Sequence, residues 1–307
     1  MMSDNSSYTI EEVSQLLRVS KLTVYDLIKK GDLPAYRVGR QMRVDHDDIE
    51  KYKSKNKTGA RNERNPPKEQ GQTARQTSQI IISGQDIALD MLSKHVENHT
   101  SFSTLRLYNG SLNSLMSMYN GECDVVSVHL YDGETGEYNT PYVKRILVSQ
   151  PFIQMNLVQR QAGIYVQKGN PHQINSMKDL SKVNIKMVNR EIGSGARILL
   201  DEQLKKQGIR PQSLNGYDNI LTSHYSVASA VAGGQADVGI GIENVTKMVN
   251  VDFIPLIMEQ YDLIILKENE KLVEAIKETV KSKEYQTQLK QFYGYDLSLS
   301  GKIIFDS

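Results

Sequence analysis

The residues most suggestive of chemistry are the turn Gly193-Ser194-Gly195, with Arg190 before it and Arg197 after it. Apolar residues alternate from Val183 to Val188, as in a strand, and then follow helical spacing up to Leu204. A glycine-flanked turn of this kind leaves the first N–H groups of the helix open to a ligand. Helix N-termini attract anions, and guanidinium groups match paired oxygen atoms. The turn therefore predicts an anion site, although an ordinary turn with surface arginines would show the same pattern.

Two similar units precede this turn. A strand expected at residues 79–82 leads into Ser83-Gly84, and a strand near residues 105–107 leads into Asn109-Gly110-Ser111, each before a helical pattern. Ligands of open α/β sheets lie at the carboxyl ends of strands, so three such turns suggest a shared pocket. Asp86 either favours the N-terminus of its own helix or accepts a proton from a ligand.

A second repetition divides the same region into halves. The segments SLNSLMSMYNGECDVVSVHL around Asp124 and SVASAVAGGQADVGIGIEN around Asp237 both predict a helix, a glycine turn, an acidic residue and an apolar strand. Two similar α/β lobes facing each other across a cleft would explain the repetition. Coincidence is the alternative, because helix-turn-strand is common in α/β proteins.

Composition excludes several classes of function. The 307 residues include one cysteine, Cys123, so we expect no disulfide and no cysteine metal cluster. No apolar run has the length of a membrane span, and the polar N-terminus does not resemble a signal peptide. We therefore expect a cytoplasmic protein without a membrane partner. No hydrolase elbow, catalytic triad, metal motif or complete dinucleotide fingerprint is present in the sequence, so we expect no enzyme and no cofactor.

The first fifty residues predict two short helices joined by a tight turn. TIEEVSQLL contains a Thr-x-x-Glu capping box and a helical apolar face, and Ser20 is placed to cap a second helix from Lys21 to Lys30. A hairpin then turns near Gly39. On it we expect four apolar residues to point inward, namely Tyr36, Val38, Met42 and Val44. Three arginines remain outward or at the tip, namely Arg37, Arg40 and Arg43.

Charge is distributed unevenly along the chain. Residues 1–75 hold 15 Lys/Arg and 11 Asp/Glu, whereas the whole chain holds 37 and 36. Eight of these basic residues lie between Lys51 and Arg75, among Asn, Gln, Gly and Pro. Such a segment buries little, so we expect a solvated basic linker that can also attract phosphates.

The stretch YTIEEVSQLLRVSKLTVYDLIKKGDLPAYRVGRQMRVDHDDIEKY resembles the excisionase and MerR-like winged helix-turn-helix family. The resemblance implies that the second helix enters the major groove of double-stranded DNA while the wing contacts the DNA backbone or minor groove. The DNA-binding residues expected from it are Ser20, Lys21, Thr23, Tyr25, Arg37, Arg40 and Arg43. A small helical protein-interaction domain is the alternative.

Residues 79–296 resemble a second family. The segments SGQDIALDML, QAGIYVQKGNP, VNREIGSGARILLDEQL, HYSVASAVAGGQADVGIGIE and DFIPLIMEQYDLII are similar to the periplasmic-binding-protein-like domain of cytoplasmic molybdate-responsive regulators. The resemblance implies a type II, two-lobed α/β fold. The chain would cross between lobes near Gln161 to Val166 and return near Phe253 to Leu263.

The same resemblance implies molybdate or tungstate as the ligand. It assigns the oxyanion to Ser83, Ser111 and Ser194, and its candidate neighbours are Asp86, His129, Arg190, Gly195, Arg197, Tyr217 and His224. A fully deprotonated tetrahedral dianion needs donors alone, whereas a protonated phosphate also needs an acceptor. Two arginines depart from the mainly neutral donors of transport-type molybdate sites, so an organic acid or a phosphate ester is also conceivable.

Together these patterns predict a winged helix-turn-helix at residues 1–54, a linker at 55–78 and a ligand-binding domain at 79–307. The first lobe is expected at about 79–162 and 260–307, and the second at 163–259. We interpret the protein as a ligand-responsive, homodimeric transcription regulator that senses a small oxyanion. Sensing of an organic solute is one alternative, and a role in molybdenum-cofactor biosynthesis is another.

Overall fold

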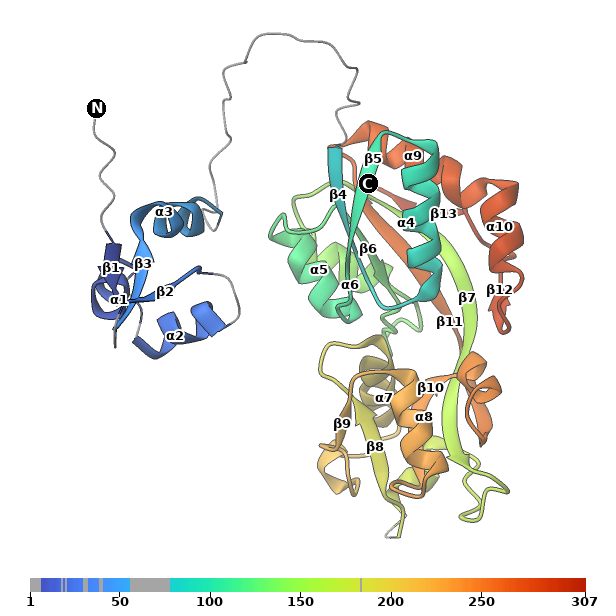
Figure 1. Ribbon diagram of the computed structural model, residues 1–307. Coiled ribbons are helices and arrows are strands. Elements are labelled where there is room, and N and C mark those ends of the chain that lie inside the picture. The colour runs from blue at the N-terminus through green and yellow to red at the C-terminus, as the bar shows by residue number, and fades with distance from the viewer. Residues whose placement is uncertain are drawn as a thin grey trace. The chain divides into compact units, whose positions relative to one another are not determined.

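The computed structural model describes residues 7–17, 19, 21–29, 33–38, 41–55, 78–182 and 184–307. The chain divides into two compact units, residues 1–72 and residues 73–307 (Figure 1). Within the described ranges, no helix combines the length and the apolar character that a membrane span requires.

The N-terminal unit is a three-stranded antiparallel sheet with three helices. Its strand order is β1-β3-β2. The elements are β1 (Ser7–Thr9), α1 (Ile10–Leu17), α2 (Lys21–Lys29), β2 (Tyr36–Val38), β3 (Gln41–Asp45) and α3 (His46–Lys55). The predicted capping box is confirmed, because the Thr9 backbone N–H donates to Glu12 Oε2 at 2.8 Å and the Glu12 N–H donates to Thr9 Oγ1 at 3.4 Å. The core is small and apolar, and it consists of Ile10, Val13, Val24, Leu33, Val44 and Ile49.

The hairpin differs from its prediction at Tyr36. Tyr36 was expected inward, but it is 44% exposed and its hydroxyl donates to Asp45 Oδ1 at 2.7 Å. Arg43 pairs with Tyr36 across the hairpin and lies on the face away from the buried Val44, which is outward as expected, and its Nη1 donates to the carbonyl oxygen and Oγ of Ser7, both at 3.2 Å. Ser7 belongs to β1, which the sequence did not predict as a strand. It pairs with β3 and makes β3 the central strand, so Arg43 lies beside a partner strand.

A ten-stranded mixed sheet forms the C-terminal unit, with the order β5-β4-β6-β11-β7-β10-β8-β9 and with β12 and β13 on β7. Two lobes are visible in Figure 1, joined by the long strands β7 (Phe152–Gln167) and β11 (Val251–Leu266). The first lobe contains β4 (Ser78–Ser83), α4 (Ile87–His99), β5 (Phe102–Leu107), α5 (Ser111–Tyr119), β6 (Val125–Val128), α6 (Thr140–Ile146), α9 (Glu270–Lys281), α10 (Lys283–Leu289), β12 (Tyr295–Asp296) and β13 (Ile303–Asp306).

The second lobe has a smaller set of elements. They are η1 (Met177–Ser181), β8 (Met187–Arg190), α7 (Gly195–Lys206), η2 (Pro211–Ser213), β9 (Ile220–Leu221), α8 (His224–Ala232), β10 (Val238–Ile242) and η3 (Glu243–Lys247). Each lobe buries its own apolar core, for example around Leu92 and Ile276 in the first and around Leu200 and Val231 in the second.

Strands β7 and β11 pair with each other over almost their whole length and contain both predicted crossings. Their register shifts between Pro255 and Ile257 and again between Tyr261 and Asp262. The fully buried carboxylate of Asp262 accepts amide N–H groups from Asn139, Gln154 and Asn156, at 2.8, 2.7 and 2.7 Å. Burial raises the pKa of Asp262, and the three amide donors oppose that rise. The second shift is therefore fixed by side-chain hydrogen bonds.

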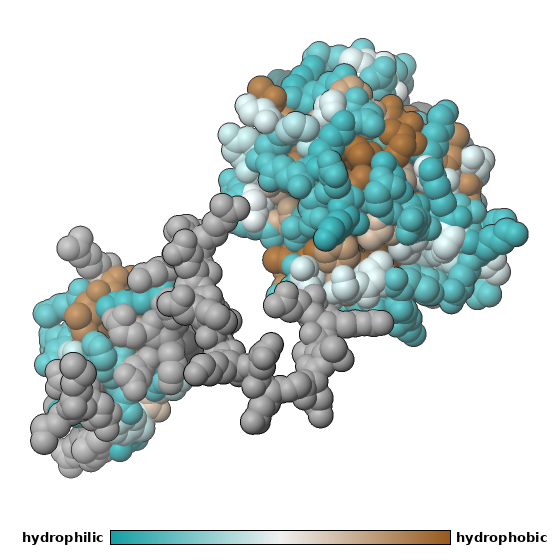
Figure 2. All heavy atoms as spheres, turned by 90° about the horizontal axis from the view of Figure 1, so that it is seen from above, coloured by the Kyte–Doolittle hydropathy of each residue, from teal (hydrophilic) through white to brown (hydrophobic). Residues whose placement is uncertain are grey.

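The surface of the C-terminal unit is mostly hydrophilic on the face that Figure 2 shows, and apolar residues gather there in small separate patches. Scattered apolar residues are usual on soluble proteins. The surface pattern alone therefore indicates no docking site.

Candidate ligand-binding site

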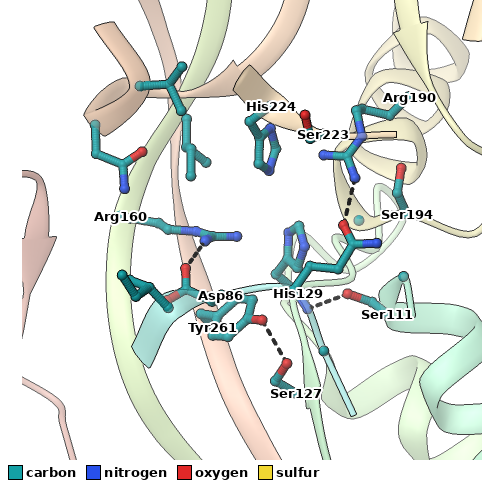
Figure 3. A pocket seen from close by; sticks show the side chains of 18 of the residues that line it. Asp86, Ser111, Ser127, His129, Arg160, Arg190, Ser194, Ser223, His224 and Tyr261 are labelled. Carbon is teal, nitrogen blue, oxygen red and sulfur yellow. Dashed lines mark hydrogen bonds and ion pairs between the residues drawn. The ribbon is translucent and has the colours of Figure 1, made fainter. Parts of the chain in front are cut away.

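A cavity of about 230 Å³ lies between the two lobes. Its wall contains the N-terminal ends of four helices, two from each lobe. They are α4 at Gly84 to Ile87, α5 at Asn109 to Ser111, α7 at Ser194 and Gly195, and α8 at Ser223 to Tyr225 (Figure 3). The long strands contribute Arg160 and Tyr261. Because a helix N-terminus carries partial positive charge and unpaired N–H groups, four such ends around one cavity favour an anion.

The four helix ends are capped in different ways. Side-chain oxygens of Asp86, Ser194 and Ser223 accept backbone N–H groups of their own helices, from Ala88 at 2.8 Å, Arg197 at 3.3 Å and Ser226 at 3.0 Å. Gly110, the N-cap of α5, has no side chain to do this. Asp86 therefore caps its own helix, which is one of the two roles left open by the sequence. The Ser194 hydroxyl also donates to the Glu191 carbonyl at 2.9 Å, so its hydrogen is already engaged.

Arg160 forms the charged floor of the cavity. Its Nε donates to Glu259 on the facing residue of β11, and its Nη1 donates to Asp86. Tyr295 donates to the other oxygen of Asp86 at 2.6 Å, and the guanidinium lies 4.4 Å from the centre of the Tyr261 ring. All three charged groups are buried. Both carboxylates are thus held by protein donors, and among the described residues Nη2 of Arg160 has no hydrogen-bond partner.

His129 extends this cluster toward the cavity. Its Nδ1 lies 3.2 Å from Glu259 Oε2, and its backbone N–H donates to Ser111 Oγ at 3.2 Å. Burial alone would raise the pKa of Glu259, but the charges of Arg160 and His129 hold that pKa well below its usual range. Since an ionised carboxylate only accepts, Nδ1 of His129 carries the hydrogen. The Nε2 atom is left for other contacts.

His224 faces the cavity from the first residue of α8 (Figure 3). Its Nδ1 is buried without a hydrogen-bond partner among the described residues, and so is Oδ1 of Asn244, which also lines the cavity. Removal from water lowers the pKa of His224 well below the ordinary value, and the positive charges of Arg190 and Arg160 lower it further. His224 is therefore neutral at pH 7.

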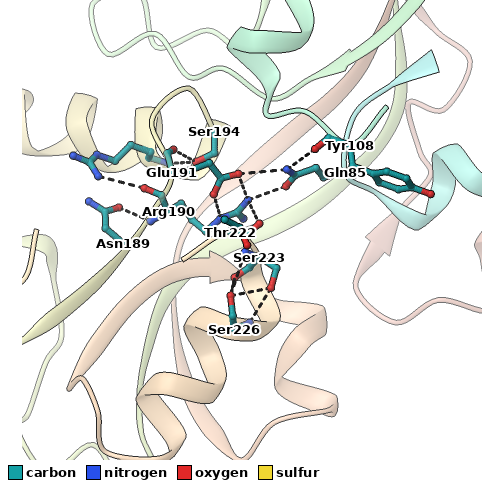
Figure 4. Close-up of polar contacts among 10 residues, drawn as sticks. Gln85, Tyr108, Asn189, Arg190, Glu191, Ser194, Thr222, Ser223 and Ser226 are labelled. Atoms are coloured by element: carbon teal, nitrogen blue, oxygen red, sulfur yellow. Dashed lines mark hydrogen bonds and ion pairs between the residues drawn. The ribbon is translucent and has the colours of Figure 1, made fainter. Parts of the chain in front are cut away.

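Arg190 is a buried residue of the cavity lining, and its contacts join the lobes (Figure 4). Its Nε and Nη2 donate to the two carboxylate oxygens of Glu191, both at 2.8 Å, and Nη2 also donates to Gln85 Oε1 at 2.8 Å. Gln85 belongs to the first lobe and also donates to the Tyr108 carbonyl at 3.0 Å. The Leu112 N–H donates to the Gly193 carbonyl across the cleft at 3.0 Å. The lobes are therefore closed upon each other.

Most of the predicted ligand residues meet at this cavity. Those that line it are Asp86, Ser111, His129, Arg190, Ser194, Gly195 and His224. Whether they bind a ligand stays a prediction.

Three predicted ligand residues lie outside the cavity lining. Ser83 is fully buried and its Oγ lies 2.9 Å from Ser114 Oγ. Arg197 packs over the ring of Tyr217, 3.8 Å from its centre, while the Tyr217 hydroxyl donates to Asp201 Oδ1 at 2.7 Å. These contacts stabilise the packing around β4 and α7.

Arg160 and Glu259 were not among the residues predicted for the site. Each is a charged residue in a long apolar strand, FIQMNLVQRQAGIYVQ and VDFIPLIMEQYDLIIL. Arg160 is the one basic residue of its strand, and β11 holds three carboxylates, Asp252, Glu259 and Asp262, so a buried arginine would have predicted a carboxylate partner without identifying which. Gln85, Ser223 and Tyr295 gave no comparable signal.

The predicted DNA-binding residues lie in the N-terminal unit. Tyr25 is 49% exposed on α2, Thr23 is exposed on the same helix, and Arg37 is exposed on β2. Lys21 Nζ lies 2.6 Å from Glu11 Oε1 in an exposed ion pair. Ser20 and Arg40 lie outside the described residues, as do Gly39, Lys30 and the side chain of Val38.

The two units match two families of known proteins. A helix-turn-helix domain family matches residues 7–57, and the PBP superfamily domain matches residues 93–281, more than half of the chain. The chain belongs to the PBP superfamily. The predicted excisionase-like helix-turn-helix fused to a domain of this type is thereby confirmed, and both matched families are binding domains rather than catalytic ones.

Two relatives cover different shares of the chain. The "Uncharacterized protein YvgK" of Bacillus subtilis (strain 168) is 54% identical over 308 residues, which cover 100% of both chains. A protein encoded in the "ferredoxin 2Fe-2S gene 5'region" of Clostridium pasteurianum is 44% identical over 110 residues, which cover 35% of this chain and 97% of that protein.

Solved structures share the fold of the C-terminal unit. A substrate-binding protein with bound phosphate from Clostridium perfringens has a TM-score of 0.51 at 15% identity and covers 71% of this chain and 98% of its own. The effector-binding domain of QuiR with shikimate gives 0.50 at 14%, covering 70% and 99%, and the ancestral amino acid-binding protein AncCDT-1, a dehydratase precursor, gives 0.51 at 17%, covering 70% and 95%. The predicted type II, two-lobed α/β class is confirmed, and at these identities only the fold is shared.

The first prediction concerns acid stability. Because the pKa of Glu259 is lower in the folded protein than the value of about 4.3 in an unfolded chain, its stabilising contribution is complete above that pH and declines as the pH falls below it. The free energy of unfolding should fall between pH 7 and pH 3 in both proteins. In Glu259→Gln this fall should be smaller than in the wild type by at least about 1 kcal/mol, measured by urea unfolding. Glu274→Gln, at an exposed ion pair, is the control. Equal acid sensitivity of the wild type and Glu259→Gln would contradict the assignment.

The second prediction concerns lobe closure. A Cβ atom at Gly195 would lie 2.4 Å from His129 Nδ1 and 2.6 Å from the His129 carbonyl oxygen. Gly195→Ala should therefore keep the lobes apart and expose the Leu112 N–H, which amide hydrogen exchange of residues 109–116 measures as at least about tenfold faster exchange. Gly233→Ala, at the C-terminal end of α8, should leave this exchange unchanged. Unchanged protection in Gly195→Ala would show that closure does not need this contact.

Proposed function

We propose that this protein is a cytoplasmic, ligand-responsive transcription regulator. Its helix-turn-helix unit binds double-stranded DNA, and its two-lobed unit binds a small anion in the cavity between the lobes. The four helix N-termini around that cavity support the anion most directly. We assign no enzymatic activity and no cofactor. Among the described residues, no group of three or more His, Cys, Asp or Glu is placed to hold a metal ion.

The DNA-binding half rests on the exposed face of α2 and on the wing. Lys21, Thr23 and Tyr25 would face the major groove, and Arg37 would contact a phosphate. Arg43 already binds Ser7, so its part is to hold β1 against β3. We propose limits of 1–54 for this domain, 55–78 for the linker and 79–307 for the ligand-binding domain.

The ligand half supports several anions. Molybdate or tungstate, which the family resemblance implies, suits the donors on the wall, namely helix N–H groups, the Ser111 hydroxyl and the free Nη2 of Arg160. The arginines do not supply excess positive charge, because Arg160 is paired with two carboxylates and Arg190 with Glu191. Organic anions are a second candidate, favoured by the exposed apolar residues Ile87, Tyr225 and Met248 in the cavity lining.

Regulation would follow from differential binding. A ligand held by both lobes stabilises the closed form, and a ligand that bound open and closed forms equally would change nothing. We propose that closure alters the pairing of two copies of the chain and therefore the spacing of two DNA-binding units. A homodimer suits this role because paired half-sites multiply specificity.

The third prediction tests the wing. Arg37→Ala should weaken binding to any duplex DNA and lower the slope of log K against log salt concentration by about one, because each lost phosphate contact releases fewer counterions. Arg210→Ala removes one exposed positive charge from the C-terminal unit and serves as the control. Fluorescence anisotropy across a salt series measures both. An unchanged slope in Arg37→Ala would remove this residue from the interface.

The fourth prediction tests the ligand class. Molybdate, tungstate, phosphate, sulfate and small carboxylates are added to the full chain, and melting is followed by calorimetry. An anion at a hundred times its Kd should stabilise the protein by about 2.7 kcal/mol, and Gly195→Ala should abolish the gain. If none of these anions raises the melting temperature of the wild type, the anion assignment is wrong.

A further inference from the structure

We propose that the ligand carries a hydrogen-bond donor of its own and that His224 accepts it. The site would then prefer a protonated oxyanion or a hydroxylated organic anion to an anion without hydrogen. This inference rests on the proposed function, since it names the class of anion that the cavity between the lobes would take.

The ring of His224 faces the cavity (Figure 3). Its Nδ1 is buried without a hydrogen-bond partner among the described residues. A neutral imidazole has one donor nitrogen and one acceptor nitrogen in either tautomer. Because Nδ1 is buried, a ligand reaches Nε2, and His224 offers it an acceptor in the tautomer that carries the hydrogen on Nδ1, which is the tautomer of this proposal.

The charges around His224 keep it in this neutral form. Arg190 from β8 and Arg160 from β7 oppose a further positive charge, as does His129, and only Glu259 favours it. Burial acts in the same direction as the two arginines. A cationic ring would offer donors alone, so the neutral state is what makes the residue an acceptor.

The carboxylates of the floor do not supply this acceptor. Asp86 already accepts from Ala88, Tyr295 and Arg160, and Glu259 accepts from Arg160 and pairs with His129. The remaining buried acceptor without a partner in the described lining is Oδ1 of Asn244. The lining therefore offers donors to a ligand, while the acceptors of His224 and Asn244 receive no hydrogen bond from the described residues.

The site should therefore prefer anions that carry an O–H group to anions that carry none. Sulfate, molybdate and tungstate satisfy donors only, and they would leave the acceptor of His224 unpaired in a closed cavity. Hydrogen phosphate has the same tetrahedral shape and one O–H group, and a 2-hydroxy acid has an O–H group beside its carboxylate. An unpaired buried acceptor weakens binding by about 10- to 100-fold.

The test compares matched ligands by isothermal titration of the full chain at pH 7.5. The affinities of hydrogen phosphate and sulfate are compared to test an inorganic ligand with an O–H group. Those of lactate and propionate are compared to test an organic ligand with an O–H group. Molybdate and tungstate complete the set. We expect the member with the O–H group of at least one pair to bind at least tenfold more tightly than its partner and than molybdate and tungstate.

Two variants connect that preference to His224. His224→Phe keeps a planar ring and removes both nitrogens, so the preference should fall to below about threefold, whereas His224→Gln keeps a donor and an acceptor and should retain part of it. His172→Phe makes the same change at a histidine that pairs with Asp237 and does not line the cavity. A cooperative melting transition of each variant without ligand shows that the variant folds. If His224→Phe does not fold, the ligand preference of the wild type and the binding by His224→Gln test the proposal.

The outcomes separate this inference from the proposed function. Binding of sulfate, molybdate or tungstate as tight as that of the O–H ligands overturns the inference and leaves an anion-responsive regulator. A preference that persists in His224→Phe overturns the role of His224. Absence of binding by every anion overturns the proposed function, and the inference with it.

Discussion

The structure depends on one buried ionic cluster, in which Arg160 pairs with both Asp86 and Glu259. Arg160 and Glu259 face each other on the two long strands that join the lobes, and Asp86 begins α4. Removing one partner from such a cluster would leave an uncompensated buried charge, which is far more costly than a lost surface pair. The cluster thereby fixes the helix end, the joining strands and the cavity floor relative to one another.

Around this floor, the cavity presents backbone and neutral groups rather than excess charge. Four helix ends point toward it, while each lining arginine is already paired with carboxylate. Recognition of an anion by oriented N–H groups has a low reorganisation cost because the helices hold them in place. It also explains why the glycines matter at the contact between lobes: Gly110 and Gly195 allow backbone atoms to meet where a side chain would intervene.

Local sequence patterns predicted the elements well and the long-range contacts poorly. The capping box of Thr9, the Gly/Ser turns before helices and the repeated halves are signals within the sequence itself. The repeated halves suggested two lobes, and the type II class came from the family resemblance. Tyr36 was misplaced, and the contact of Arg43 with β1 was not predicted, because both contacts depend on strand pairing. Periodicity says which face a residue occupies, and it does not say which strand lies beside it.

The register shifts in β11 have a mechanical consequence. Asp262 locks the shift nearest the first lobe, and the other shift lies at Pro255, so the segment between them is where the two strands can bend most easily. Glu259 lies within that segment, opposite Arg160. Arg160 and Glu259 are thus cross-strand neighbours on the strands that join the lobes. Separation of the lobes would break the contact of Arg190 with Gln85 and that of Gly193 with Leu112, and it would leave the pairing of Arg160 with Glu259 intact.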